Sequence, residues 1–389
     1  MVAGSALACA GLLGVVDVEP AGAGGSNDWE QIDAGSVHNC GITSSGRLFC
    51  WGNDSQGQLG DGSACCNSST PIEVFGEATN WKQVDAGGDH TCALKTSGRL
   101  YCWGDDDNGQ VGDGAPATDV NTPVEVSGSA NDWKRVAVGG EHTCATKTSG
   151  RLYCWGDDVV GQLGDGTAGA DSSTPTQVTG TTTDWKKITG GASHTCATKQ
   201  SGHLFCWGSD AFGQLGDGSA GASSANPGEV AGAASNWKQP TGGSSHGCAV
   251  KKNKRLYCWG ADNEGQLGDG PGAGGPAPTQ VFGFLTTWKR VSAGQGFTCA
   301  SKKNGRLYCW GGDASGQLGN GAGGPADAPV EVTGSATDWK QVAVGATHAC
   351  ARKANGRLYC WGNDTSGQLG DGTVAGGTAT SPQEVVSHP

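Results

Sequence analysis

Cysteine pairs with a constant spacing are the main chemical feature of this chain of 389 residues. Fourteen of its 17 cysteines form seven pairs whose members lie ten positions apart, and in six units a histidine precedes the first cysteine by two residues. Thiols in this pattern can close disulfide bonds, bind a metal ion, or stay reduced as small buried side chains. The pairs are Cys40 with Cys50, Cys92 with Cys102, Cys144 with Cys154, Cys196 with Cys206, Cys248 with Cys258, Cys299 with Cys309, and Cys350 with Cys360.

The residues between the paired cysteines favour a disulfide. Residues 96–98, Thr-Ser-Gly, fit the turn of a β-hairpin. Cys92 and Cys102 are then cross-strand neighbours with Cβ atoms about 4.5–5.5 Å apart, near disulfide reach. Zinc is the weaker alternative, because Phe297 replaces the histidine in the sixth unit and no unit offers more than three ligands. We therefore expect seven disulfides and an oxidising compartment, with buried reduced thiols as the alternative.

Other residues whose side chains could take part in chemistry are assigned structural roles. We expect the recurring histidines to satisfy backbone groups in the core, and the extra Cys65 and Cys66 either to pair with each other or to be reactive. Aspartate recurs in Gly-rich turns, where it can bind Ca²⁺ or accept backbone hydrogen bonds. We prefer the second role, with residues 105–107 as the one place for a weakly bound ion. The two series are Asp54, Asp106, Asp158, Asp210, Asp262, Asp313 and Asp364, and Asp61, Asp113, Asp165, Asp217, Asp269 and Asp371.

A repeat of 51 or 52 residues positions all these side chains. The 14 tryptophans form two series with this step: Trp29, Trp81, Trp133, Trp185, Trp237, Trp288 and Trp339, and Trp51, Trp103, Trp155, Trp207, Trp259, Trp310 and Trp361. Each unit holds several short β-rich runs and no helical period. The repeat predicts an all-β fold, a seven-bladed β-propeller with four-stranded blades, with an open β-solenoid as the alternative.

The two ends of the repeat predict how the ring closes. A Pro-x-Glu-Val segment, with Gln for Glu in two copies, precedes a tryptophan by ten residues in six places, a spacing typical of a hairpin, as at Pro71 and Trp81. Only the last such segment has no tryptophan after it, so we expect residues 382–386 to pair with 29–32. The propeller is assigned to 28–389. Residues 1–27 are predicted to be a leader, either a partial signal peptide, with lipidation of Cys9 as a further alternative, or a disordered segment.

The repeat resembles that of the regulator of chromosome condensation family. The G-x-x-H-T-C-A and W-G-x-D-x-x-G-Q-L-G-D-G segments carry the resemblance, the second of them at 51–62, 103–114 and five further sites. The resemblance implies a seven-bladed propeller, and the paired cysteines resemble repeats of secreted or surface bacterial proteins. Family members include an exchange factor for a small GTPase, a plant ultraviolet receptor and a secreted β-lactamase inhibitor. The receptor's G-W-R-H-T motif is absent here, whereas a role as a binding protein is compatible with the chain.

Composition and the most variable loop indicate what the protein binds. The formal charge of −12 disfavours nucleic acid and anionic membranes, and no apolar run is long enough to span a bilayer. The two residues before each G-Q-L-G segment break the repeat, and they are apolar at Val159, Val160 and Phe212. With Asp107 and Glu264 beside them, these residues are predicted to form an apolar binding patch with an acidic rim.

These observations predict a monomeric, non-enzymatic propeller, secreted or at the cell surface, that binds an unidentified protein partner. No catalytic set or phosphate-binding loop stands out from the repeat, so no cofactor is expected. Two alternatives stay open: an intracellular guanine-nucleotide exchange factor with reduced thiols, and an enzyme with its site in the central channel.

Overall fold

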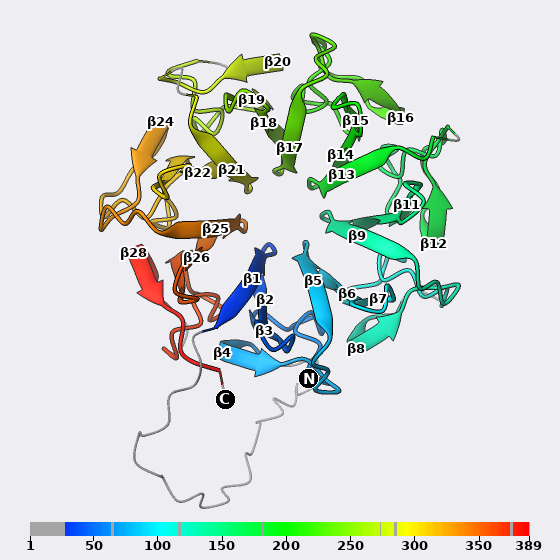
Figure 1. The fold of residues 1–389 in the computed structure, drawn as a ribbon, viewed down its shortest axis with the longest axis horizontal. Coiled ribbons are helices and arrows are strands. Elements are labelled where there is room, and N and C mark those ends of the chain that lie inside the picture. The colour runs from blue at the N-terminus through cyan, green and yellow to red at the C-terminus, as the bar shows by residue number, and fades with distance from the viewer. Residues whose placement is uncertain are drawn as a thin grey trace, which may run out of the picture.

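Seven four-stranded antiparallel sheets stand as blades around a central channel (Figure 1). The computed structural model describes residues 28–63, 66–115, 118–180, 182–272, 274–283, 286–373 and 376–388. Each blade is built from four consecutive strands, so blade 1 is β1–β4 and blade 7 is β25–β28. No helix forms in these residues, and hence none that could cross a membrane. The expected all-β propeller with four-stranded blades is confirmed.

The strands recur at the same repeat positions. The first strand of each blade lines the channel: β1 (Trp29–Ala34), β5 (Trp81–Ala86), β9 (Trp133–Val138), β13 (Trp185–Gly190), β17 (Trp237–Gly242), β21 (Trp288–Ala293) and β25 (Trp339–Val344). The second strands are β2 (His38–Thr43), β6 (His90–Lys95), β10 (His142–Lys147), β14 (His194–Lys199), β18 (His246–Lys251), β22 (Phe297–Lys302) and β26 (His348–Lys353).

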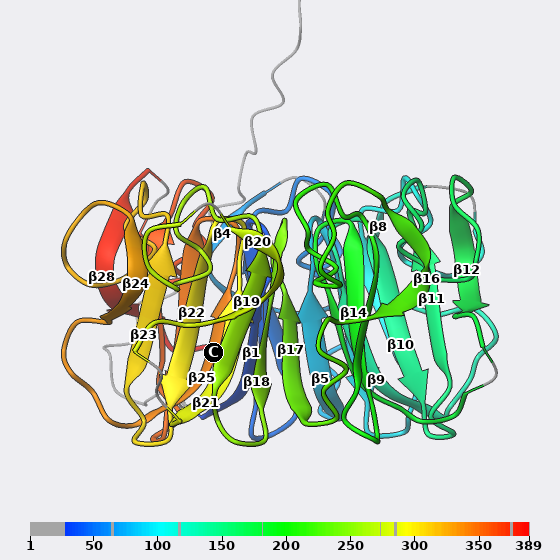
Figure 2. The ribbon, with the colours of Figure 1, turned by 90° about the horizontal axis from the view of Figure 1, so that it is seen from above.

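The outer half of each blade holds the remaining two strands. The third strands are β3 (Leu48–Gly52), β7 (Leu100–Gly104), β11 (Leu152–Gly156), β15 (Leu204–Gly208), β19 (Leu256–Gly260), β23 (Leu307–Gly311) and β27 (Leu358–Asn363). The fourth strands form the circumference of the ring (Figure 1), so that β28 and β12 lie at its two edges in the side view of Figure 2: β4 (Ser68–Glu73), β8 (Val120–Glu125), β12 (Ser172–Gln177), β16 (Ser224–Glu229), β20 (Gly275–Gln280), β24 (Ala326–Glu331) and β28 (Thr378–Glu384).

A disulfide joins the second and third strands of every blade. Cys92 lies directly opposite Cys102 in the ladder of β6 and β7, and the other pairs have the same register. Their Cα atoms are 4.0–4.1 Å apart, and all seven expected pairs are bonded. Besides Cys92 with Cys102, the bonded pairs are Cys40 with Cys50, Cys144 with Cys154, Cys196 with Cys206, Cys248 with Cys258, Cys299 with Cys309, and Cys350 with Cys360. Cys9 and Cys65 lie outside the described residues.

The hydrophobic core lies between adjacent blades. Ile42, Leu48 and the disulfide of Cys40 in blade 1, for example, pack against Trp81 and Trp103 of blade 2. The second series of tryptophans is completely buried, and every indole Nε1 donates to the carbonyl oxygen of the glutamine in the G-Q-L-G segment of the preceding blade, at 2.9–3.1 Å. The second glycine of this segment must lack a side chain, because a Cβ on Gly60 would lie 2.4 Å from the Trp103 nitrogen. The repeat motif therefore connects neighbouring blades, and we call each contact region between two blades a joint.

The ring closes without the expected strand exchange. β28 pairs with β27 of its own blade, and Trp29–Ala34 pairs with His38–Thr43 alone, so the predicted pairing of 382–386 with 29–32 is wrong. Each Pro-x-Glu-Val segment lies at the end of the outermost strand of its blade, and in blades 1–6 the residues that follow, such as 75–80, connect this strand to the inner strand of the next blade. Blades 7 and 1 meet through the same contacts as the other blades, with Asn39 Nδ2 donating to the Gln368 carbonyl (2.8 Å).

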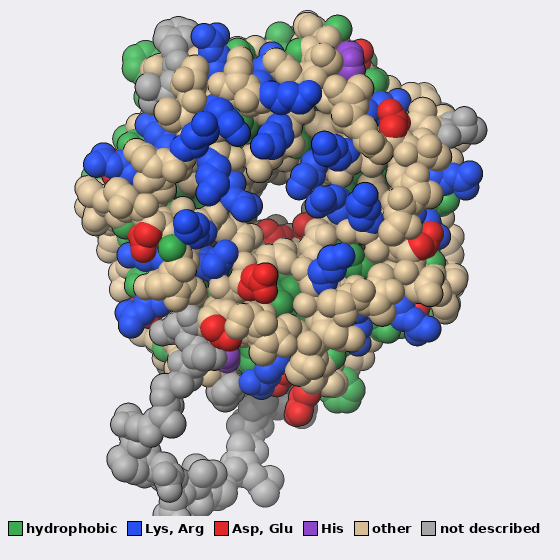
Figure 3. All heavy atoms as spheres, in the orientation of Figure 1, with side chains coloured by type: hydrophobic (Ala, Val, Ile, Leu, Met, Phe, Trp, Pro, Cys, Tyr) green, Lys and Arg blue, Asp and Glu red, His purple; other side chains and the backbone are tan. Residues whose placement is uncertain are grey.

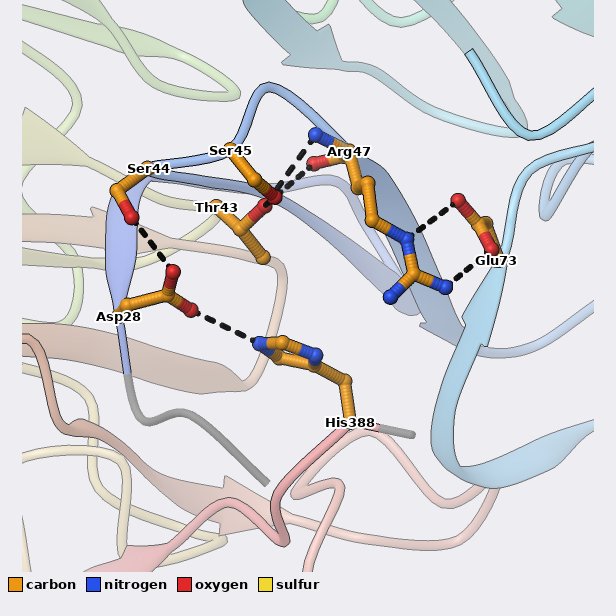
Figure 4. A network of polar contacts seen from close by, with 7 residues as sticks. All are labelled: Asp28, Thr43, Ser44, Ser45, Arg47, Glu73 and His388. Atoms are coloured by element: carbon orange, nitrogen blue, oxygen red, sulfur yellow. Dashed lines mark hydrogen bonds and ion pairs between the residues drawn. The ribbon is translucent and has the colours of Figure 1, made fainter. Parts of the chain in front are cut away.

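The C-terminal residues also contact the start of blade 1 (Figure 4). The His388 ring is 5 % exposed and packs on Trp29 and Phe49, with centroid distances of 5.0 and 4.7 Å. Its Nε2 lies 3.1 Å from Asp28 Oδ1, and Ser44 donates to the other Asp28 oxygen (2.5 Å). The contacts of His388 with Trp29, Phe49 and Asp28, which we call the closing clasp, therefore replace the shared β-strand that was expected.

Candidate interaction faces

The recurring histidines connect neighbouring blades. Nε2 of His90 lies 2.8 Å from the Thr143 hydroxyl of the next blade, and His38, His142 and His246 make equivalent contacts. Burial lowers the pKa of these four histidines to about 3, so they are neutral at physiological pH. The expectation that these rings satisfy backbone groups is wrong: Nε2 meets a side chain from the adjacent blade.

Both aspartate series stabilise turns. In all seven blades Oδ1 of the first aspartate accepts the backbone N–H five residues further on, as from Leu59 to Asp54 (3.0 Å). Burial raises the pKa of Asp54, Asp106, Asp158 and Asp262 to about 6. Five of the six second-series aspartates, and Asn320, accept the N–H two residues on. The structural interpretation of these residues is confirmed.

The acidic loop of blade 2 brings together a different set of carboxylates from the 105–107 triplet. Oxygen atoms of Asp105, Asp107 and Asp119 lie within 4.8 Å of one another, whereas Asp106 is buried in its turn. Asp105 accepts the Asp107 N–H (3.1 Å) and Asp119 accepts the Asp106 N–H (3.4 Å). These carboxylates are thus used in the folding of their own loop.

The channel wall at the ends of the inner strands is made of small residues. It encloses about 330 Å³ and is lined by Gly, Ala and Val together with Ser36, Ser244 and Gln295. The described lining contains hydroxyl and amide groups but no ionisable side chain. The alternative of an enzyme with a site in the channel therefore receives no candidate acid, base or charged ligand from this wall.

A hollow beside this end of the channel contains two of the five predicted patch residues. It measures about 380 Å³ and shares Ser244 and Gln295 with the channel wall. Phe212, which is 51 % exposed, and Glu264 line it from adjacent blades. The glutamines two positions further on, Gln214 and Gln266, hold these residues in place, since each side-chain oxygen accepts the N–H of the patch residue (2.9 Å).

The remaining patch residues do not line this hollow. Val159 is 67 % exposed and Val160 is half-buried, one blade away, and Asp107 is exposed two blades away. The structure also exposes Phe75 (63 %) and Phe282 (58 %), which the sequence reasoning missed. Both follow the valine after the fourth strand, where the other blades carry Ser, Thr, Ala or Val, so the departure from the repeat could have indicated them.

The opposite mouth of the channel is basic, which the net charge does not suggest. Figure 3 shows Lys and Arg side chains gathered around the opening. They come from the two positions after each first-series tryptophan, and we call this set the cation ring: Lys82, Lys134, Lys186, Lys238, Lys289 and Lys340, with Arg135, Lys187 and Arg290. Blade 1 contributes Glu30 instead. The sequence reasoning missed the ring, because a lysine follows six of the seven first-series tryptophans and therefore does not depart from the repeat.

The fold, the disulfides and the contacts between blades define a seven-bladed repeat propeller. A model of the RCC1-like domain matches residues 15–282, and models of the regulator of chromosome condensation (RCC1) repeat match 288–317, 339–368, 304–352 and 355–389. The chain therefore belongs to the RCC1 family of β-propellers.

Relatives of established name differ widely in what they do. Ultraviolet-B receptor UVR8 of Arabidopsis thaliana is 30 % identical over 354 residues, which cover 88 % of this chain and 78 % of the receptor. Regulator of chromosome condensation of Mus musculus is 28 % identical, covering 79 % and 77 %. E3 ubiquitin-protein ligase HERC2 of Homo sapiens is 29 % identical over 84 % of this chain, which spans only 7 % of that ligase.

Solved structures show the same fold at low identity. Prp20p of Saccharomyces cerevisiae superposes with a TM-score of 0.78 at 22 % identity, covering 88 % of this chain and 87 % of Prp20p. Human WBSCR16 gives 0.77 at 18 % identity, covering 87 % and 94 %.

Proposed function

We propose that this protein is a non-enzymatic, secreted or cell-surface propeller that binds another protein through the hollow at Phe212 and Glu264. The observation that carries the proposal is the half-exposed phenylalanine in a concave site on a rigid scaffold. An apolar centre with a charged edge is the usual composition of a protein interface. Blades held by disulfides and turns held by glutamine limit the entropy lost when a partner is bound.

Relatives and chemistry support a binding role. Receptors and regulators occur among the relatives, and the yeast Prp20p structure was described with its binding to Gsp1p and histones. The histidines and recurring aspartates, which could otherwise serve catalysis, are engaged in joints and turns.

Capture experiments with matched phenylalanine variants test the binding site. The immobilised wild type, Phe212→Ala and Phe282→Ala proteins are incubated with extract from the native surroundings, and bound proteins are identified by mass spectrometry. Phe282 has similar exposure but lies outside the hollow, so it is the control. We expect a partner retained by Phe282→Ala and lost by Phe212→Ala, with equal melting temperatures. Retention of every partner by Phe212→Ala would remove the hollow from the proposal.

An exchange-factor-like regulator inside the cell is the second candidate, favoured by the similarity to Regulator of chromosome condensation. Counting thiols in the denatured, unreduced native protein separates the two candidates. The extracellular proposal requires that at most the three cysteines outside the seven pairs react. Reaction of all 17 would favour the intracellular regulator.

A further inference from the structure

The cation ring lies at the end of the channel opposite the Phe212 hollow. Its residues stand at the starts of the inner strands, whereas Ser244 follows the end of β17 and lines the hollow. A six-residue strand spans about 17 Å, so the two surfaces are separate. An inference about the ring therefore goes beyond the proposed function and stands or falls independently of it.

A break in the repeat places three of the cations at the mouth. In blades 1, 2, 5 and 7 the second residue after the tryptophan is glutamine, and in blades 1, 2 and 7 its amide donates to a carbonyl of the next blade, as from Gln83 to Val136 (2.8 Å). Blades 3, 4 and 6 have Arg135, Lys187 and Arg290 at this position. In every blade a β-bulge lies at the residue directly after the tryptophan. The bulge turns the side chains of this residue and of the next one out of the regular ladder. These blades thus carry a cation where the others carry glutamine.

The positive charge at this mouth far exceeds the negative charge, since the cation ring has nine cations and Glu30 is the one carboxylate among the described residues that line the hollow. None of the eight ion pairs between described residues includes a member of the cation ring. Arg135 Nε is buried and has no hydrogen-bond partner among the described residues. Burial lowers the pKa of Lys187, and repulsion from Arg135, Arg290 and two lysines lowers it further. Like charges held together in excess of their counter-charges destabilise a fold unless an anion binds them.

The mouth is also concave. A hollow of about 680 Å³ is lined by Lys82, Lys134, Arg135 and Arg290, together with Glu30 of blade 1 and the polar residues Gln31, Gln83, Thr96 and Gln341. Cations therefore converge on one opening from several blades, and amides and a hydroxyl lie beside them. This arrangement can hold several carboxylates and hydrogen-bond to a peptide backbone at the same time.

We propose that the cation ring binds an acidic segment of a polypeptide, rich in Asp or Glu, at the mouth of the channel. Carboxylates from a flexible segment can reach cations around a closed circle, which a rigid duplex lying across the face cannot do. Single-stranded nucleic acid is bound with aromatic stacking platforms, whereas the one aromatic residue among the described residues that line this hollow, Trp81, is only 5 % exposed. The net charge of −12 opposes long polyanions that extend beyond the mouth of the channel.

Glutamine variants remove the charge without harming the fold. Arg135→Gln, Lys187→Gln and Arg290→Gln each insert the residue that blades 1, 2, 5 and 7 carry at this position. The triple variant should melt at or above the temperature of the wild type, because the amides can bond to the next blade. The control is Arg151→Gln, Arg255→Gln and Arg357→Gln, an equal loss of charge from the turns before the third strands, outside the hollow.

Fluorescence anisotropy with labelled octaglutamate, octaglutamine and oligothymidylate tests the proposal. At low salt we expect octaglutamate to bind, octaglutamine not to bind, and affinity to fall as salt approaches about 0.15 M. The triple ring variant should bind octaglutamate about tenfold more weakly, and the control within about twofold of wild type. Equal losses in the two triple variants, no loss in the ring variant, no octaglutamate binding, or tighter binding of oligothymidylate would overturn the proposal. Should the triple variant unfold, Lys187→Gln alone is expected to weaken binding about threefold, and unchanged binding would overturn it.

Discussion

The joint between blades 2 and 3 and the joint between blades 6 and 7 solve the same packing problem in opposite ways. In the first, Gln83, Asp85 and His90 all bond to blade 3, at 2.8–2.9 Å. In the second, Arg290, Ser292 and Phe297 stand at these positions, and none of them hydrogen-bonds to blade 7 in the described part of the chain. Phe297 faces Ala349, so both members of the histidine–threonine pair have changed together.

The difference shows which part of the joint is essential. The tryptophan–glutamine bond occurs in both, from Trp155 to Gln110 (3.0 Å) and from Trp361 to Gln317 (2.9 Å). The other polar contacts can be replaced by apolar packing, provided that no buried polar group loses its partner. The joint between blades 4 and 5 is intermediate, since Gly247 replaces the threonine and leaves His194 Nε2 without a described partner.

Converting the first joint into the second gives the largest expected effect, and it depends on pH. The pKa of His90 is about 3 in the folded protein, well below its unfolded value, so this histidine supports folding above about pH 6.5 and opposes it increasingly as pH falls. His90→Phe with Thr143→Ala removes this opposition. Relative to wild type, the double variant should gain about 3 kcal/mol of unfolding free energy between about pH 6.5 and 4.5.

Urea unfolding across this pH range measures the gain. Thr143→Ala alone is the control, because it leaves a buried imidazole without its partner and should cost about 2 kcal/mol at neutral pH. A double variant whose stability relative to wild type does not change with pH would contradict the assignment of His90 as a neutral joint residue.

Replacing the carboxylate of the polar joint should stabilise the protein at alkaline pH. Burial, followed by repulsion from Asp33, raises the pKa of Asp85. Its contribution to stability is therefore complete below about pH 4 and is lost as pH rises through the raised value. Thr189 and Thr241 make the same inter-blade contact with a neutral hydroxyl (3.0 and 3.1 Å). Asp85→Thr should gain about 2 kcal/mol at about pH 8 and little at about pH 4.

Chemical denaturation at the two pH values checks this prediction. Thr189→Ala serves as the matched control and should lose about 1 kcal/mol at both. Lower stability of Asp85→Thr at the alkaline value would mean that the carboxylate is favourable where it stands.

The smallest effects concern the glutamine contact. Gln83→Ala should cost about 1 kcal/mol, because one hydrogen bond across the joint is lost. Arg290→Gln should change stability in the other direction by up to about 1 kcal/mol, since an amide can reach the carbonyl of Val342, the counterpart of Val136. Thermal melts of both variants decide the point, and a loss in Arg290→Gln would show that the arginine itself holds blades 6 and 7 together.

Local features of the chain were predictable because they depend on residues close together in sequence. Cys92 and Cys102 pair across one turn, and Asp54 accepts an N–H five residues away, so spacing alone indicates both contacts. The step between tryptophans likewise defined the number of blades. The exposed Phe212 was also indicated by sequence, because it departs from the repeat in a turn.

Contacts between blades were not predictable in this way. The Pro-x-Glu-Val segment followed by tryptophan has the spacing of a hairpin, yet the structure uses it to cross from one blade to the next. His90 contacts Thr143, 53 residues away, and the sequence of neither segment indicates that the two residues meet. The closing clasp joins Asp28 and His388 over 360 positions.

The amino-acid sequence by itself determined the blades, their disulfides and their turns, because hairpin pairing and side-chain alternation act over a few residues. Only the tertiary structure decided how the ring closes, which buried polar groups meet, and where charge gathers. These depend on curvature accumulated over seven blades, which brings the same repeat position of every unit to one mouth of the channel. A chain of net charge −12 can thereby present a basic opening, since the position of each charge in space, and not the sum of the charges, sets the local field.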